Sequence, residues 1–227
     1  MSTKYASLIK DLRTKAGFSQ ALVAEKLDLS RQSYMAIEAG VRGMTLQEAE
    51  GLCGLYGISI EELSGSIAPN YEKYKQMILA YLQAGADWRG KVPKTKLAKL
   101  LYLADFSWYY EHEESMSGMP YRKIQYGPVP DLYFRALDEL FESGKIDIEK
   151  DGDHLYVSLS GGGSNTALDT LQDDEVELIG KIATKWKNER TQAIVDFTHE
   201  QIPYKKCLIN EIIPYELIRQ EDLRNVY

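Results

Sequence analysis

The sequence predicts a mostly α-helical protein with one small β-hairpin, in which five short helices precede a longer helical α+β region. Three observations lead to this class. Apolar residues recur at helical spacing over most of the chain. Capping residues and glycines divide the first 60 residues or so into short helices. Apolar and polar residues alternate over 145–149, and 155–159 returns as a second strand after the turn pair Asp151-Gly152.

The first domain is expected over residues 1–66, and its helices have clear ends. Their apolar periodicity places them at 4–15, 20–27, 31–39, 46–56 and 58–63. The second, third and fourth helices follow residues whose hydroxyls suit an N-cap, namely Ser19, Ser30 and Thr45. The first, third and fourth are followed by glycines that can end a helix, namely Gly17, Gly40 and Gly57.

A tight turn joins the second and third helices, which gives the helix-turn-helix arrangement. The segment 18–40 reads FSQALVAEKLDLSRQSYMAIEAG and resembles the Xre family, whose domain is of the lambda-repressor type. The matching pieces are Ser19-Gln20, Leu22–Ala24, Leu29–Arg31, Ile37–Gly40, Thr45-Leu46 and Gly57–Ser59. Asp28 stands where the family usually has the glycine of the turn, and aspartate tolerates left-handed geometry.

This resemblance implies that the first domain binds operator DNA. In the motif, the second helix of the pair meets base edges and the start of the first meets phosphate. The expected contacts are Gln20, Ser30, Arg31, Gln32, Ser33, Tyr34 and Arg42. Arg31 can pair with guanine, and Gln32 with adenine, through two hydrogen bonds each. The alternative is that these are ordinary solvated helix residues, and Tyr34 can equally pack in the core.

A linker is expected at residues 67–70, because the stretch GSIAPN has small residues, one proline and no periodicity. The second domain is then expected over 71–227. Its helices are expected at 71–84, from Lys94 onward, and at 131–143, 173–187 and 191–200, with a short one from Pro214. The segment 121–126 is expected to be extended and to run into a turn that Pro128 and Pro130 hold open.

Short motifs follow one another in a definite order along this second domain. They are Lys96-Leu97, Lys99–Tyr102, Asp105, Tyr126–Val129, Phe197–Glu200 and Pro203. In order and spacing they resemble the Panacea domain, also called the SocA-like domain, over roughly residues 70–220. That family is known chiefly as the antitoxin half of toxin–antitoxin pairs, and as a protease adaptor for one toxin. The resemblance therefore implies a cognate toxin as partner and no established catalytic activity.

Charge and aromatic content point to a protein partner for the second domain. Residues 69–227 hold 20 Lys+Arg and 26 Asp+Glu, which argues against nucleic acid and fits a basic protein. The chain also has 16 tyrosines, whose apolar rings and polar tips suit both a core near the surface and an interaction face. The candidate toxin contacts are Tyr109, Tyr110, Glu113, Glu114, Tyr121 and Tyr126. The alternative is that the rings pack in the core and the carboxylates are solvated.

Other features give no support to catalysis, a metal or a cofactor. Cys53 lies on an apolar helix face, while Lys205 and Lys206 are expected to lower the pKa of Cys207. His199 is expected to be a buried histidine with a hydrogen-bond partner, and 161–163 to be a flexible connector. Without a signal peptide or a membrane-spanning run, the expected compartment is the cytoplasm.

The combination of domains predicts an antitoxin that neutralises a toxin by direct binding and represses its own operon, as a homodimer on a two-fold site. The alternative is a bacterial or prophage transcriptional regulator whose second domain senses a signal or mediates assembly. An enzyme is a third possibility, which only isolated histidines and cysteines would favour.

Overall fold

The computed structural model describes residues 4–58, 60–63, 69–85, 90–161 and 166–227. The chain forms two compact units, Met1–Ala68 and Pro69–Tyr227, and each is described here by itself. The predicted linker at 67–70 lies partly outside the described residues, as does most of the predicted connector at 161–163. No helix in the described ranges is both long and apolar enough to cross a membrane.

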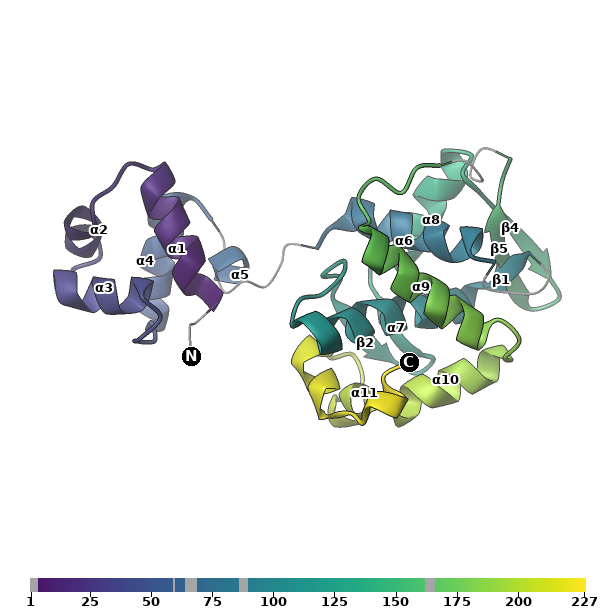
Figure 1. Cartoon of the computed structure of the whole chain (residues 1–227). Helices are drawn as coiled ribbons and strands as arrows, with labels where there is room; N and C mark the ends of the chain where they lie inside the picture. Colours follow the sequence, from purple (N-terminus) through teal and green to yellow (C-terminus); the bar gives the residue numbers. More distant parts are fainter. Residues whose placement is uncertain (1–3, 59, 64–68, 86–89, 162–165) are drawn as a thin grey trace. The chain divides into compact units, whose positions relative to one another are not determined.

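The first unit consists of short helices whose ends agree with the sequence analysis (Figure 1). They are α1 (Lys4–Lys15), α2 (Gln20–Lys26), α3 (Arg31–Glu38), α4 (Leu46–Tyr56) and α5 (Ile60–Leu63). The three predicted N-caps are confirmed, because each hydroxyl accepts a backbone N–H from the first turn of its helix. Asp28 has a φ of 55° at the turn between α2 and α3, so aspartate adopts the left-handed geometry that was expected.

The second unit is arranged around one long buried helix, α7 (Lys94–His112). Every residue from Lys96 to Tyr109 is buried, so α7 lacks the solvated face of a surface helix. The surrounding helices are α6 (Tyr71–Gln83), α8 (Tyr133–Glu142), α9 (Asp173–Trp186), α10 (Thr191–Glu200), α11 (Ile202–Lys206) and the 3₁₀ helices η1 (Tyr215–Gln220) and η2 (Leu223–Asn225). α6, α9, α10 and η1 pack directly against α7, and α9 passes across it in Figure 1.

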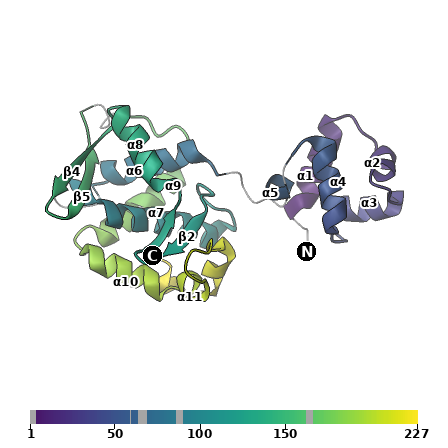
Figure 2. The ribbon, with the colours of Figure 1, turned by 180° about the vertical axis from the view of Figure 1, so that it is seen from behind.

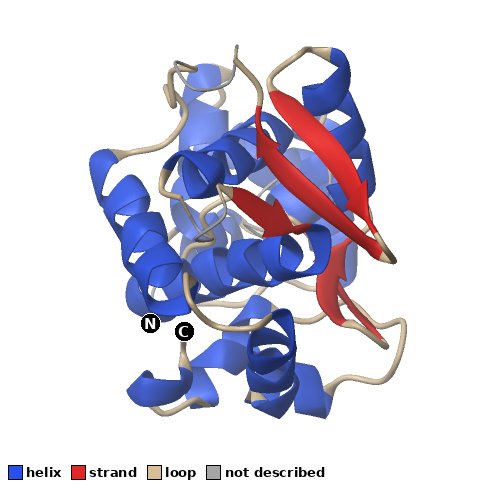
Figure 3. Ribbon diagram, turned by 90° about the vertical axis from the view of Figure 1, so that its right-hand side faces the viewer, coloured by secondary structure: helices blue, strands red, loops and turns tan. Residues whose placement is uncertain are grey.

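The predicted hairpin is present as β4 (Ile146–Asp151) and β5 (His154–Leu159). Asp151 pairs with His154, so the two loop residues are Gly152 and Asp153, one position later than expected. A third strand, β1 (Lys91–Pro93), extends the sheet to the order β1-β5-β4, visible in red in Figure 3. β1 has only three residues, which is too short for alternation to reveal it.

A second hairpin corrects the expectation of a turn at Gly127–Pro130. These residues form β3, which pairs with β2 (Tyr121–Ile124). The two prolines are tolerated because β3 is an edge strand in a two-stranded sheet, where a missing N–H need not break the ladder. Figure 2 shows β2 beside α10 and α11, and the Tyr204 hydroxyl of α11 donates to the Ile124 carbonyl.

Candidate functional sites

Helix α3 presents one face to solvent and buries the other. Its N-cap Ser30 accepts a hydrogen bond from the Ser33 N–H at 3.1 Å. Arg31, Gln32 and Met35 are exposed. Tyr34 and Ile37, on the opposite face, are buried in the core. The exposed residues therefore form one stripe at helical spacing, with the hydrogen-bonding side chains at the helix start.

A buried carboxylate fixes how α3 packs against α1 and α2. Arg13 donates from Nε to Glu38 Oε2 at 2.7 Å and from Nη2 to Oε1 at 2.8 Å, and the Gln20 amide donates to Oε1 at 3.2 Å. Burial acts to raise the pKa of Glu38, but the hydrogen bonds from Arg13 and its other neighbours outweigh burial and lower it. Glu38 thus stays ionised and joins three helices, which orients the exposed stripe.

Three of the predicted DNA contacts are buried or already have partners within the first unit. Tyr34 is fully buried in the core of the first unit, so the expectation that it touches DNA is wrong. Gln20 is half-buried, and its amide nitrogen is committed to Glu38. Arg42 donates to Glu48 at 2.8 Å, and that carboxylate also completes the N-terminal capping box of α4. The charge of Arg42 is therefore already paired.

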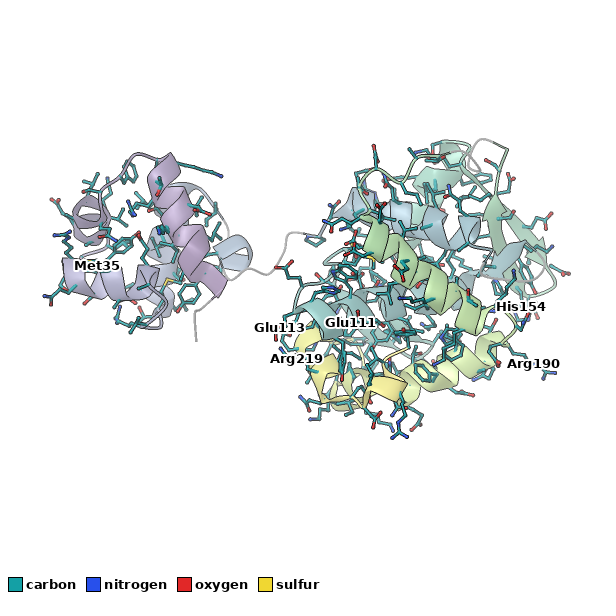
Figure 4. All side chains as sticks on the ribbon, in the orientation of Figure 1. Met35, Glu111, Glu113, His154, Arg190 and Arg219 are labelled. Atoms are coloured by element: carbon teal, nitrogen blue, oxygen red, sulfur yellow. The ribbon has the colours of Figure 1, made fainter. Side chains whose placement is uncertain are left out.

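Met35 is the residue that the sequence analysis missed on this face. Its side chain is 41% exposed, three positions after Gln32, and Figure 4 labels it on α3. Tyr34 is larger and more polar at its tip, so its residue type favours a DNA contact although its position on the helix does not. Helical spacing alone would have separated the two, because Ile37 is in the core and lies three positions from Tyr34, on its side of the helix.

In the second unit, the motif residue Asp105 lies at the centre of a buried hydrogen-bond group. Its Oδ1 accepts the Ser117 N–H at 2.6 Å, and its Oδ2 accepts the hydroxyls of Ser117 at 2.5 Å and Tyr121 at 2.8 Å. Burial raises the pKa of Asp105 to about 6, although these donors act to lower it. The carboxylate ties the loop after α7, and the start of β2, back to the helix.

Two motif lysines on α7 also tie other segments to this helix through hydrogen bonds. Lys99 donates to the Pro128 carbonyl in β3 at 2.9 Å, and burial lowers its pKa to about 7. Lys96 donates to the carbonyls of Lys187 at 3.3 Å and Glu189 at 2.9 Å, between α9 and α10. Both amines bind backbone oxygens, so these motif residues hold the fold together.

Gly127 of the same motif is required by a close approach. Its φ is +95°, and a Cβ there would lie 2.6 Å from Lys99 Cε and 3.0 Å from His199 Nε2. Any side chain at this position would push the lysine away from the β3 carbonyl. His199 stacks on Tyr204 with ring centroids 4.3 Å apart, and its Nε2 lacks a hydrogen-bond partner in the described part of the chain, which differs from the expected hydrogen-bonded histidine.

The predicted toxin contacts do not form one surface. Tyr121 is fully buried and Tyr109 is 8% exposed, so the expectation that these two rings meet a partner is wrong. Tyr110 is half-buried and Glu114 is exposed. Glu113 forms an ion pair with Arg219 of η1, and Figure 4 shows the two side by side near Glu111. Only Tyr126, 68% exposed, presents a large ring to solvent.

Cysteine chemistry and metal binding find no support in the geometry. Burial, with the nearby charge of Glu211, raises the pKa of Cys207, contrary to the expectation. Lys205 and Lys206 have other partners, since Lys205 pairs with Glu200 and Lys206 donates to Gln220. Cys53 is buried, as expected. Within the described residues, no three His, Cys, Asp or Glu side chains lie close enough together to hold a metal ion.

Comparisons with known proteins agree with this division of the chain. The helix-turn-helix family HTH_3 matches residues 9–63, and the family described as "Antitoxin SocA-like, Panacea domain" matches residues 97–204. Over 75 residues the chain is 33% identical to the cryptic phage CTXphi transcriptional repressor RstR of Vibrio cholerae, a match that covers 33% of this chain and 68% of that protein. No solved structure matches. Both matched families are non-enzymatic: one binds DNA and the other comprises antitoxins.

Proposed function

Because the chain belongs to the Xre-type helix-turn-helix proteins through residues 9–63 and carries an antitoxin SocA-like Panacea domain at 97–204, we propose that it is an antitoxin that neutralises a toxin protein and represses its own operon. The observation that carries the DNA-binding half is the exposed stripe of α3, held in place by the buried Glu38. The antitoxin half rests on the domain family.

The stripe suits base reading in a major groove. Arg31 supplies two parallel donors for guanine, and the Gln32 amide supplies a donor and an acceptor for adenine. Met35 adds an apolar tip that suits the methyl group of thymine. The similar phage protein is a transcriptional repressor, which supports the same role for this chain. As in other helix-turn-helix proteins, a homodimer would place two such helices on a two-fold operator about one helical turn of DNA apart.

Toxin binding belongs to the surface of the second unit. Most of the motif residues that define its family, among them Lys96, Lys99 and Asp105, are buried and maintain the fold. Recognition of the partner therefore falls to exposed side chains, of which the motif includes Tyr126. With 20 Lys+Arg against 26 Asp+Glu, residues 69–227 are acidic and unsuited to a second nucleic-acid contact.

One double variant of the full chain tests both halves. Arg31→Ala with Gln32→Ala removes two exposed side chains and should lower affinity for the gene's own upstream DNA by about 2–6 kcal/mol, since each bidentate contact contributes about 1–3. The same variant should still protect cells that express the reading frame adjacent to this one. Lys10→Ala with Gln47→Ala, both exposed and outside α3, is the matched control and should leave both readouts unchanged.

The outcomes separate the candidate functions. Unchanged DNA affinity of the double variant at fixed salt would remove α3 as the reading helix. Failure of the parent protein to protect cells from the adjacent reading frame would favour a transcriptional regulator whose second domain has another task. If the double variant no longer represses the operon but still protects cells, the chain is an antitoxin with two separate activities.

A further inference from the structure

We propose that the second unit holds its toxin in a groove around Tyr126, and that the occupant is an extended toxin segment carrying a carboxylate beside an apolar side chain. The inference rests on the proposed antitoxin function and names the contact face and the chemistry of the partner. The Tyr126 groove is lined by Pro93, Lys94, Thr95, Tyr126, His154, Leu155, Arg190 and Thr191, among others.

The groove lies where several elements of the second unit end. The starts of α7 and α10, the tip of the β4–β5 hairpin and the loop between β2 and β3 all contribute, and its volume is about 590 Å³. Figure 4 shows His154 on the hairpin and Arg190 at the start of α10 on the same side of the unit. Figure 3 shows the two hairpins in red on one face.

A smaller cavity of about 130 Å³ opens next to the groove and shares Lys94, Thr95 and Tyr126 with it. Its other lining residues are mainly apolar, namely Ala98, Lys99, Ile124, Val129, Tyr133 and Phe134. Tyr126 is 68% exposed and Phe134 51% exposed at the rim. An apolar pocket with exposed aromatic rings at its edge is the arrangement that receives the anchor side chain of a protein partner.

The charges of the groove select an acidic partner. Within the described residues, neither Lys94 nor Arg190 forms an ion pair, and the Lys94 ammonium lies over the Phe134 ring, 4.5 Å from its centroid. Of the described lining residues, Asp153 carries the only carboxylate. Two unpaired cations in an otherwise acidic unit therefore favour a carboxylate, both in steering the encounter and in fixing the register.

The N-termini of α7 and α10, which lie in the groove, also favour a carboxylate on the partner. Pro93 precedes α7 and Arg190 precedes α10, and neither side chain caps its helix. The first N–H groups of both helices thus receive no acceptor from the N-cap side chain at the positive ends of the helix dipoles. A carboxylate from the partner can accept these N–H groups while it pairs with the adjacent cation.

The surface around Glu113, which the sequence analysis predicted as the toxin contact, is less suitable for binding a partner. Glu113 is already paired with Arg219, and the tyrosines nearest to it in the sequence offer little exposed area. Tyr109 is buried, so that face lacks the large exposed ring that anchors an interface. Among the predicted toxin contacts, Tyr126 is the one that belongs to the groove.

The test uses the full chain and, as probe, the protein encoded by the adjacent reading frame. Tyr126→Ala and Arg190→Glu should each weaken binding by about tenfold or more, and the double variant should fail to protect cells. The matched control replaces an exposed aromatic residue and an exposed cation outside the groove, Phe141→Ala with Lys206→Glu, and should bind within about twofold of the parent. Tryptophan fluorescence during urea unfolding should be unchanged in all of these variants, which shows that the second unit is folded, because all three tryptophans of the chain lie beyond residue 70.

Charge reversal tests the chemistry of the occupant. One acidic residue of the toxin, changed to lysine, should restore binding to Arg190→Glu and weaken binding to the parent. If Arg190→Glu binds like the parent while Tyr126→Ala does not, the acidic occupant is wrong. If the double variant protects as well as the parent, the groove is wrong although the antitoxin function stands. If the parent itself neither binds nor protects, the proposed function fails and this inference fails with it.

Discussion

The first unit displays part of its family motif at the surface, whereas the second unit buries most of the motif residues by which it is identified. Arg31 and Gln32 lie in solvent on α3, but Lys99, Asp105 and Gly127 lie in the core around α7. The same kind of sequence match therefore locates a binding surface in one unit and mainly the scaffold in the other. For the second unit, function has to be sought on exposed residues, of which the motif includes Tyr126 in the loop between β2 and β3.

The two units also differ in how each stabilises a buried carboxylate. Glu38 in the first unit is held by the guanidinium of Arg13, and its pKa is lowered although burial opposes this. Asp105 in the second unit is held by hydroxyl and backbone donors, and burial raises its pKa. A charged partner offsets the cost of burying an ion, while neutral donors offset it only in part.

The largest expected effect comes from removing Asp105. Asp105→Ala leaves buried donors of Ser117 and Tyr121 without their acceptor, so the second unit should lose about 3 kcal/mol of unfolding free energy or more at pH 7.5. Tryptophan fluorescence during urea unfolding reports on this unit alone, because all three tryptophans of the chain lie beyond residue 70.

The control for this variant is Asp196→Ala, an exposed aspartate on α10, which should change the unfolding free energy by less than about 0.5 kcal/mol. Operator affinity should survive Asp105→Ala, since the DNA-binding stripe belongs to the other unit. Equal destabilisation by both aspartate variants would show that the buried group around Asp105 does not have the role given to it here.

A smaller effect should appear in the pH dependence of stability. Burial lowers the pKa of Lys99 from 10.5 to about 7, so between these values the unfolded chain binds more protons than the folded one. Stability of the second unit should therefore rise with pH, with Lys99 contributing up to about 1.4 kcal/mol per pH unit. Lys99→Met keeps the apolar stem and removes the titrating amine, so it should flatten this rise.

The measurement is the difference between Lys99→Met and the parent in urea unfolding at pH 7 and pH 8.5. The parent should gain about 1.6 kcal/mol relative to the variant over this interval. Lys205→Met is the control, because that lysine is exposed on α11. Parallel pH profiles for Lys99→Met and the parent would mean that Lys99 titrates alike in the folded and unfolded chain.

Local signals predicted the fold well where they were strong. The capping hydroxyls at Ser19, Ser30 and Thr45 and the alternating strand at Ile146 follow rules that act within a few residues, and the structure confirms them. Contacts between distant segments could not be predicted in this way. β1 is identified as a strand only by its pairing with β5, some 60 residues later.

The candidate sites show the same limit. The residue types of Tyr34 and Tyr121 favour binding contacts, but their burial depends on packing against residues far along the chain. The groove around Tyr126 draws on β1, β5 and α10, whose proximity no local pattern encodes. Burial of Lys99 was equally hidden, because a lysine on one turn of an apolar helix normally reaches solvent.

The smallest expected effect sharpens the account of the DNA-binding stripe. Met35→Ala shortens an exposed apolar side chain next to Gln32 and should weaken operator binding by about 1 kcal/mol, through lost contact with a thymine methyl group. Replacing that thymine by uracil removes the same methyl from the DNA and should cost the parent protein a similar amount. Since either change alone removes the contact, the two together should cost no more than one. Additive losses in this double cycle, measured at fixed salt, would place Met35 away from the base edge. Tyr34→Phe serves as the control, because its ring is buried and the change should leave the loss on thymine-to-uracil replacement as it is in the parent.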